Sequence, residues 1–222
     1  MLLAASRAGA DSLLITEAVV DPQGDHSESS GGNGVPYDGM PGTGSISTVD
    51  EFLEIYNAGP VAIDLARHVL EFLDTSPEVY VFGSGGSVVL RFSAGSSIHA
   101  LLPGGFVVIG NPPGAMNNLI EILLRDGDGA LLDRLSISSG AASGPGDEAI
   151  ARAWDGVRFL STFVRAPISP LSPLPPAPPG SVAAAAPLPE PGTLATTALI
   201  LLLAARSSLR RARRGSRRRH DA

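Results

Sequence analysis

Apolar positions along the chain occur in short runs that turn-forming residues separate. Residues 13–20, LLITEAVV, are rich in branched apolar side chains, which is typical of a β-strand. Residues 50–57, DEFLEIYN, alternate: Leu53 and Ile55 lie on one side, and the residues between them lie on the other. This period of two predicts a strand with one face buried.

Further runs of the same kind follow, and Gly, Pro or Asp separates most of them. We expect a strand to begin within 61–65, and others at 68–73, 79–82, 87–92, 105–110, 119–124, 130–137, 149–154 and 158–164. No long segment with a helical period lies between them, so the pattern predicts an all-β sandwich. Residues 21–48, dominated by Gly, Ser, Asp and Pro, predict one long loop with little to bury.

Composition agrees with short strands and many turns, because the chain holds 26 Gly and 19 Pro but only 5% aromatic residues. The chain has no cysteine, which excludes disulfide bridges, thiolate metal sites and a cysteine nucleophile. Its four histidines are His26, His68, His99 and His220. Their spacing fits no metal motif, so we expect no histidine metal site.

Two acidic segments raise the question of calcium. In Asp126-Gly127-Asp128-Gly129 the further ligands of a calcium loop are missing, and Asp-Gly favours a hairpin turn. We therefore predict a turn, and leave weak calcium binding open there and at Asp21, Asp25 and Glu28. No cofactor is expected.

The glycine-rich stretches carry no catalytic motif. Ser139-Gly140 and Gly144-Pro145-Gly146 fit neither a nucleophile elbow nor a phosphate-binding loop. No trio of nucleophile, base and orienting residue stands out, so we predict that the chain is not an enzyme.

The stretches LLITEAVVDP (13–22), DEFLEIYN, AIDLARHVL (62–70), LPGGFVVIG (102–110), DGALLDRL (128–135) and AIARAWDG (149–156) resemble the lamin-tail domain. The resemblance covers about residues 12–168. It implies an immunoglobulin-like β-sandwich that serves as an interaction module and has no catalytic residues. The residues that match its hallmark positions are Asp50, Glu51, Glu54, Asn57, Pro103, Gly104 and Gly105.

The chain departs from this family at Arg67 and His68, where the family usually has Gly and Trp. A core aromatic is thus missing, and we expect Trp154 or Phe72 to compensate for it.

Three of the hallmark side chains allow a physical prediction. Asn57 precedes a turn, so its side chain is expected to accept hydrogen bonds from the N–H groups of that turn. Glu51 and Glu54 flank an apolar strand. We expect each of them to be solvated or paired with an arginine across the sheet.

Beyond the predicted sandwich the composition changes. Residues 166–192 hold ten prolines and predict an extended spacer, of which 169–186 form the linker proper. The apolar residues from 191 to 209 would form about 28 Å of helix, close to the length of a membrane span.

The charge of the chain is uneven. Residues 206–222 hold eight Arg and one Asp, a net charge of +7, whereas residues 1–205 have a net charge of −13. Arginines directly after an apolar run predict a cytoplasmic end for residues 210–222. A nucleic-acid arm is the less favoured alternative, because no aromatic residue is interleaved to stack on bases.

The order of these parts is itself a motif. Pro189-Glu190-Pro191, then an apolar run, then an arginine cluster, together resemble the PEP-CTERM sorting signal of Gram-negative bacteria over residues 187–214. The arginines that carry the resemblance include Arg210, Arg211, Arg213 and Arg214.

This second resemblance implies an inner-membrane precursor that the membrane protease exosortase processes, followed by a surface or extracellular location linked to exopolysaccharide and biofilm. It favours reading residues 1–11 as the remnant of a signal peptide; the alternative is an N-terminus without regular structure. The expected partners are exosortase, and an extracellular polysaccharide or another surface protein, with nucleic acid disfavoured.

The function expected from the sequence is that of an exported, non-enzymatic surface or matrix protein. Two alternatives stay open. One is an accessory module of a separately encoded extracellular nuclease or phosphoesterase. The other is a single-pass membrane protein that is never cleaved. The loop at 21–48 is our hypothesis for the binding face, because loops tend to carry function.

Overall fold

A computed structural model of the chain describes residues 13–116, 119–138 and 148–172. These residues form β-strands and one short 3-10 helix, and they belong to one compact unit. The elements are β1 (Leu13–Val19), η1 (Thr48–Asp50), β2 (Phe52–Asn57), β3 (Val69–Leu73), β4 (Glu78–Val81), β5 (Val89–Phe92), β6 (Phe106–Gly110), β7 (Ile120–Arg125), β8 (Leu131–Ile137), β9 (Glu148–Trp154) and β10 (Phe159–Pro167).

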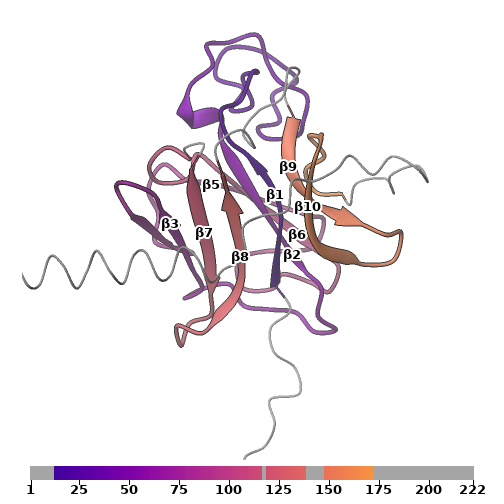
Figure 1. Ribbon diagram of the computed structural model, residues 1–222. Helices are drawn as coiled ribbons and strands as arrows, with labels where there is room; N and C mark the ends of the chain where they lie inside the picture. Colours follow the sequence, from indigo (N-terminus) through magenta and orange to yellow (C-terminus); the bar gives the residue numbers. More distant parts are fainter. Residues whose placement is uncertain (1–12, 117–118, 139–147, 173–222) are drawn as a thin grey trace, which may run out of the picture. The chain divides into compact units, whose positions relative to one another are not determined.

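The strands form two antiparallel sheets that face each other (Figure 1). One sheet has the order β10-β9-β1-β2-β6-β5, and the other has the order β4-β3-β7-β8. The predicted all-β sandwich is therefore confirmed, and most predicted strands lie within one or two residues of the observed ones.

A single apolar core fills the space between the sheets. The six-stranded sheet contributes Leu13, Ile15, Leu53, Ile55, Val107 and Ile109, and the four-stranded sheet contributes Leu70, Phe72, Tyr80, Ile122, Leu124, Leu135 and Ile137. Inward and outward side chains alternate along each strand, as the pleat of a strand requires.

The outward face of β2 is buried too, so the prediction of a strand with one buried face is wrong. Phe52 and Glu54 point away from the main core, and both are buried. Two segments cover them: the β1–β2 loop, residues 20–51, and a segment that we call the C-terminal strap, residues 168–172. Around Phe52 these segments form a second small core of Val19, Tyr37, Val108, Ala149, Ile168 and Leu171.

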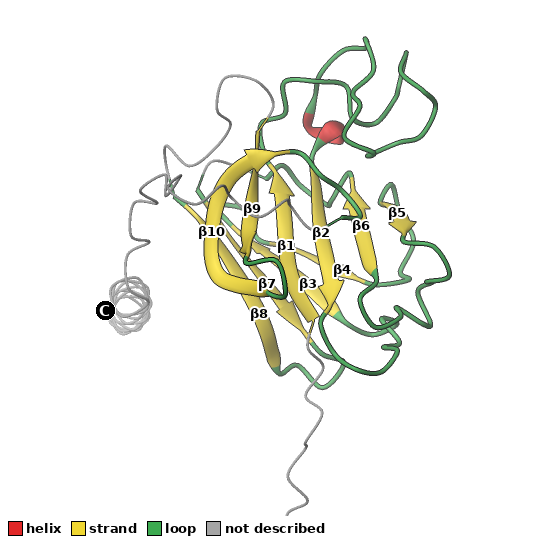
Figure 2. Cartoon of the chain, turned by 90° about the vertical axis from the view of Figure 1, so that its right-hand side faces the viewer, coloured by secondary structure: helices red, strands yellow, loops and turns green. Residues whose placement is uncertain are grey.

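The β1–β2 loop has the predicted length, but it has more to bury than its composition indicated (Figure 2). Tyr37 is only 2% exposed, and its ring packs against Phe52 with centroids 5.9 Å apart. Its hydroxyl donates to the Val49 carbonyl over 2.7 Å. Gly110 lies beneath the ring, where a Cβ would be 2.0 Å from Tyr37 Cε2.

No strand begins within residues 61–65, which corrects that prediction. The segment makes one isolated bridge, between Ile63 and Leu101. The Val61 carbonyl accepts from the Asn57 side chain instead of from a neighbouring strand. The backbone here is thus bonded to a turn, although Leu65 is fully buried.

The two departures from the lamin-tail pattern have visible consequences. Arg67 has φ 86°, a left-handed conformation that glycine adopts without cost. His68 is buried at the next position. Phe72 lies in the core, whereas Trp154 is half-buried and packs against Phe159 outside it.

Several predictions concern residues outside the described part of the chain. They are the signal-peptide remnant at 1–11, the glycine loops at 139–146, most of the linker, the PEP-CTERM-like segment at 187–214 and the arginine tail. Within the described residues, no helix is long and apolar enough to cross a membrane.

Candidate functional site

The outer face of the six-stranded sheet carries the hallmark residue Glu54. The β1–β2 loop lies at one end of the strands of this sheet (Figure 2). The face also carries a pair of buried glutamates that the C-terminal strap contacts, and a group of aromatic rings.

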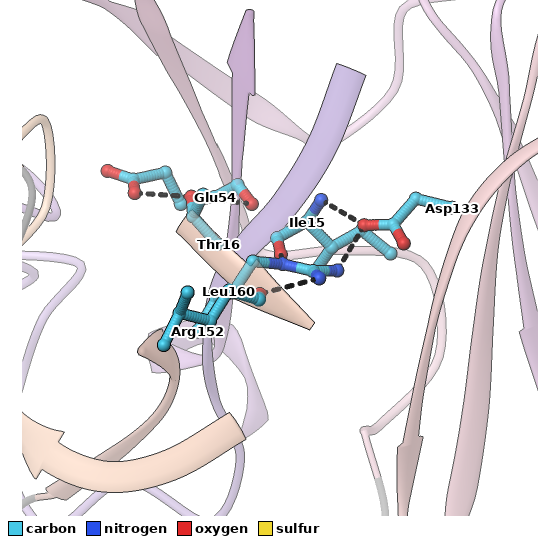
Figure 3. A network of polar contacts seen from close by, with 6 residues as sticks. All are labelled: Ile15, Thr16, Glu54, Asp133, Arg152 and Leu160. Carbon is cyan, nitrogen blue, oxygen red and sulfur yellow. Dashed lines mark hydrogen bonds and ion pairs between the residues drawn. The ribbon is translucent and has the colours of Figure 1, made fainter. Parts of the chain in front are cut away.

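Glu17 of β1 lies directly opposite Glu54 of β2 in the antiparallel register. A register shift between Ile15 and Glu17 places Thr16 beside them. The Thr16 hydroxyl donates to Glu54 Oε1 over 2.6 Å, a contact drawn in Figure 3. All three polar side chains are buried.

The C-terminal strap satisfies the remaining carboxylate oxygens. The Leu171 amide donates to Glu54 Oε2 over 2.5 Å, and the Ser169 amide donates to Glu17 Oε1 over 3.0 Å. Composition alone predicts that residues 169–172 belong to the linker. These contacts show that they belong to the domain.

Burial raises the pKa of Glu17 from 4.5 to about 7. Burial also raises the pKa of Glu54 well above 4.5, and the nearby Glu17 charge adds to this effect. Both carboxyls therefore hold a proton to higher pH than an exposed glutamate does. The prediction that Glu54 is solvated or paired with an arginine is wrong, because the strap and Thr16 enclose it.

Glu51 is likewise buried and not solvated, which corrects the second half of that prediction. Its Oε2 accepts from the Met116 amide over 2.6 Å, and burial raises its pKa to about 7. Asp50, at the end of η1, accepts from the Ser27 amide through Oδ1 and from the Ser47 amide through Oδ2. Asp50 thus connects the first part of the β1–β2 loop, at Ser27, with its last part, at Ser47. Glu51 connects the loop to the segment before β7.

The Asn57 side chain accepts a hydrogen bond from the turn that follows it, as predicted. Its Oδ1 accepts from the Gly59 amide, and its Nδ2 donates to the carbonyls of Val61 and Leu101.

The hallmark turn at Pro103-Gly104-Gly105 docks on Asn57 through the backbone. The Gly104 amide donates to the Asn57 carbonyl, and the Asn57 amide donates to the Gly105 carbonyl, both over 2.9 Å. Gly104 has φ 72°, and a Cβ on Gly105 would lie 2.7 Å from Ser96 Oγ. The structure thus brings together hallmark residues that lie more than 40 positions apart in the sequence.

An arginine that the sequence did not single out joins the two sheets. Arg152 Nη2 forms an ion pair of 2.5 Å with Asp133 Oδ2, and its Nε donates to the Ile15 carbonyl (Figure 3). Nη1 donates to the Leu160 carbonyl, and the same Asp133 oxygen accepts from the Ile15 amide. The guanidinium also lies 4.5 Å from the centroid of the Phe163 ring.

The acidic segment Asp126–Gly129 forms the turn between β7 and β8, as predicted. Asp126 Oδ1 accepts from the amides of Asp128 and Ala130, and Gly129 has φ 86°. This carboxylate is thus used to hold the hairpin.

Three of the four histidines lie within the described residues. His99 pairs with the exposed Asp64, His26 and His68 are buried separately, and His220 lies outside the described residues. Among the described residues, no group of three or more His, Asp or Glu side chains has the arrangement of a metal site. A metal in this part of the chain would therefore need hydroxyl, carbonyl or water oxygens among its ligands.

Four aromatic rings form a cluster at the end of the outer face: Tyr56, Phe106, Trp154 and Phe159. The ring centroids are 4.7 Å apart for Tyr56 and Phe106, and 5.0 Å apart for Tyr56 and Phe159. Trp154 and Phe159 are 4.8 Å apart. Phe106 is buried, whereas the other three rings are half-buried and reach the surface. We call this group the aromatic cluster.

A pocket of about 160 Å³ lies away from all of these features, beside the turn that follows β3. It is lined by Phe72, Asp74, Thr75, Ser76, Glu78, Pro113, Gly114 and Ala115. Its volume is below the few hundred Å³ that ligand pockets usually have, and none of the hallmark residues lines it.

Comparison with known proteins leaves the family of this chain open. No model of a protein family matches the sequence, and no curated protein does. Two solved structures are similar at 15% identity. The archaellum periplasmic stator protein FlaG from Sulfolobus acidocaldarius has a TM-score of 0.33, with 57% of this chain and 98% of that chain covered.

The second is the complex of FlaF and FlaG from the same organism, with a TM-score of 0.32 and coverage of 61% of this chain and 96% of that chain. Both scores are below 0.5, so neither likeness bears on the function of this chain.

Sequence reasoning missed Glu17, Asp133 and Arg152. The signal for Glu17 was present, because it is the one charged residue within the apolar run 13–20. Nothing in the sequence pairs Asp133 with Arg152, since that contact depends on how the two sheets are stacked.

Proposed function

We propose that the chain is an exported, non-enzymatic protein of the cell surface or extracellular matrix, with a lamin-tail-like sandwich as its interaction module. The PEP-CTERM-like segment at 187–214 would hold the precursor in the inner membrane until exosortase processes it. The observation that carries the proposal is the order of Pro189-Glu190-Pro191, apolar run and arginine cluster, placed after an ordered domain.

The use of the hallmark residues supports an interaction module over an enzyme. The Asn57 side chain holds the Gly59 amide and the Leu101 carbonyl, and Glu54 holds the C-terminal strap. Asp50 and Glu51 fix the β1–β2 loop. Their polar atoms accept or donate within the protein, so these side chains act as a scaffold and not as reagents.

The aromatic cluster is our proposal for the binding surface, and polysaccharide for its ligand. Aromatic ring faces carry negative potential, and the C–H bonds of a sugar ring are weakly positive, so the two stack. Three of the rings reach the surface beside the exposed hairpin end at Val157. The rings are inclined to one another by 43° to 82°, so both ring faces and ring edges contribute to this apolar surface.

Fractionation of the producing cells tests the sorting part of the proposal. A tag inserted in the exposed β9–β10 turn, at residues 155–158, leaves both termini native. We expect the tagged protein in the membrane and surface fractions, and a Pro189→Ala, Glu190→Ala variant held in the membrane. A tagged protein that is soluble in the cytoplasm with its arginine tail intact would overturn the proposal.

Tryptophan fluorescence tests the ligand. Trp154 is the only tryptophan of the chain, so its emission reports on the aromatic cluster. We expect the exopolysaccharide of the same cells to change the emission in a saturable way, and Phe159→Ala to weaken binding about tenfold. Val79→Ala, on the exposed face of β4, is the matched control and should bind normally. An unchanged emission spectrum would contradict polysaccharide as the ligand.

A further inference from the structure

The β1–β2 loop contains a carboxylate that no protein group neutralises. Both oxygens of Glu28 are buried, and neither has a hydrogen-bond partner among the described residues. A buried carboxylate without donors or a counter-charge is strongly disfavoured. Every hallmark carboxylate of the outer face, by contrast, accepts at least one backbone or hydroxyl hydrogen bond.

Glycines hold the Glu28 carboxylate in place. A Cβ on Gly32 would lie 1.4 Å from Glu28 Oε2, and a Cβ on Gly42 would lie 3.3 Å from the same oxygen. The carboxylate therefore rests directly on glycine backbone, where any larger residue would displace it. Glu28 itself has φ 59°, so the chain adopts an unfavourable conformation at this residue.

Other oxygens line the same glycine segments. Thr43 Oγ1 is 2.6 Å from the position of a Cβ on Gly31, and Ser30 Oγ is 2.2 Å from that of a Cβ on Gly44. The Gly31 carbonyl oxygen is 2.8 Å from the position of a Cβ on Gly42, which is also the position that lies 3.3 Å from Glu28 Oε2. Hydroxyl and carbonyl oxygens are the oxygen ligands that calcium accepts in irregular loops.

The loop itself supplies no arginine or lysine for this site. Residues 13–66 contain neither Arg nor Lys, although six carboxylic side chains lie between residues 21 and 51. Arg91 reaches the loop from β5, but its Nη1 donates to the Tyr37 carbonyl over 2.9 Å.

The neighbouring Asp25 is held in its ionised form by other groups of the loop. Burial opposes its ionisation, but hydrogen bonds from the Ser29 amide and from the hydroxyls of Ser27 and Ser29 lower the pKa of Asp25 to about 2. It therefore stays ionised and adds to the negative potential of the loop.

We propose that the β1–β2 loop binds one divalent cation, calcium by its ligand chemistry, with the Glu28 carboxylate as the charged ligand. Serine, threonine and backbone carbonyl oxygens of residues 30–44 complete the set of ligands with water. The site is independent of the sorting signal, because it lies wholly within the sandwich domain. Its role is to fix the loop that covers Phe52.

Calorimetry of the full chain in detergent tests this proposal. After treatment with EGTA, CaCl₂ is titrated into the protein, and thermal unfolding is recorded with and without 5 mM calcium. We expect one site with Kd on the order of 10⁻⁴ to 10⁻³ M, the range of extracellular calcium modules, and a higher Tm in calcium. Magnesium at the same concentration should raise Tm less.

Two variants separate calcium binding from loss of folding. Glu28→Gln keeps the shape of the side chain but removes its charge, and should weaken calcium binding at least tenfold. In EGTA its Tm should equal or exceed that of the wild type, because an unneutralised buried charge is gone. Asp64→Asn removes the same charge from an exposed carboxylate outside the loop and should bind as the wild type does. Equal calcium binding by Glu28→Gln, or no heat and no Tm change in the wild type, would overturn the proposal.

Discussion

The Leu171 amide donates a hydrogen bond of 2.5 Å to Glu54 Oε2, and so fastens the end of the ordered domain to the centre of its larger sheet. Glu54 lies on β2, between β1 and β6, and Leu171 lies in the last described residues before the proline-rich spacer. Glu17 binds Ser169 in the same way. The strap thus determines where the spacer leaves the domain.

This pair of glutamates makes stability depend on pH. The pKa of Glu17 is about 7 in the folded chain and 4.5 in the unfolded chain. The folded state therefore binds the additional proton, and this stabilisation is complete below pH 4.5 and is lost as the pH rises through 7. For one such group, the free energy of unfolding falls by on the order of 3 kcal/mol as the pH rises. Chemical unfolding followed by Trp154 fluorescence at pH 5, 7 and 8.5 measures it.

Amide substitutions identify the groups responsible. Glu17→Gln and Glu54→Gln should each flatten the pH dependence, because the amide oxygen still accepts from the strap but does not titrate. Glu121→Gln, whose side chain is half exposed, should leave the slope unchanged. A stability that rises between pH 5 and 8.5 would contradict this assignment.

The ion pair of Arg152 with Asp133 should be the most costly one to break. Its two side chains are only 6% and 15% exposed. Removing one partner leaves a charge buried without compensation, which typically costs about 3–5 kcal/mol. We expect Arg152→Ala to lower the free energy of unfolding by this amount in urea titrations. Arg158→Ala is the control, because Arg158 is 78% exposed and its pair with Asp155 should contribute less than about 1 kcal/mol. Similar losses in the two variants would be incompatible with the proposed role of Arg152.

Asn57→Ala should destabilise the domain by about 2–4 kcal/mol, because it leaves buried partners such as the Leu101 carbonyl unsatisfied. Asn33→Ala, at an exposed position of the β1–β2 loop, should cost less than about 1 kcal/mol. Differential scanning calorimetry compares the two. Equal Tm values for both variants would mean that the Asn57 side chain does not hold the Leu101 and Val61 carbonyls in place.

Gly110→Ala tests whether the β1–β2 loop is packed on the sheet. The new methyl group would meet the Tyr37 ring at 2.0 Å, so the ring and its loop must move. We expect a loss of about 1–3 kcal/mol, as for overpacked cores, and faster cleavage of the loop by a protease. Gly129→Ala is the control: its new methyl group would meet no atom within 4 Å, so the only cost is that of the backbone conformation at φ 86°. The β1–β2 loop should stay protected from the protease in this variant. Unchanged protease resistance in Gly110→Ala would show that the loop is not seated on Gly110.

The fold was largely predictable because each strand carries its own local signal. Apolar runs and Gly or Asp turns located most strands, and Asp126 formed the expected hairpin. The burial of Glu51 and Glu54 was not predictable, since it depends on two distant segments that cover the outer face. Their sequence neighbours gave no sign that the Met116 and Leu171 amides would reach them.

Two further contacts could not be predicted for the same reason: the ion pair of Arg152 with Asp133, and the packing of the Tyr37 ring on Gly110. Each joins elements whose contact is decided by the stacking of sheets or the path of a long loop. A pattern of alternating residues records which side of a strand is apolar, but not what lies against that side.

Mass spectrometry of the C-terminus of protein recovered from the cell surface or culture medium tests the central claim most directly. We predict a mature chain that ends near Pro189-Glu190-Pro191 and lacks the arginines from 210 onward. A surface protein that retains the complete tail through Ala222 would contradict processing at this signal and would instead support a permanently anchored protein.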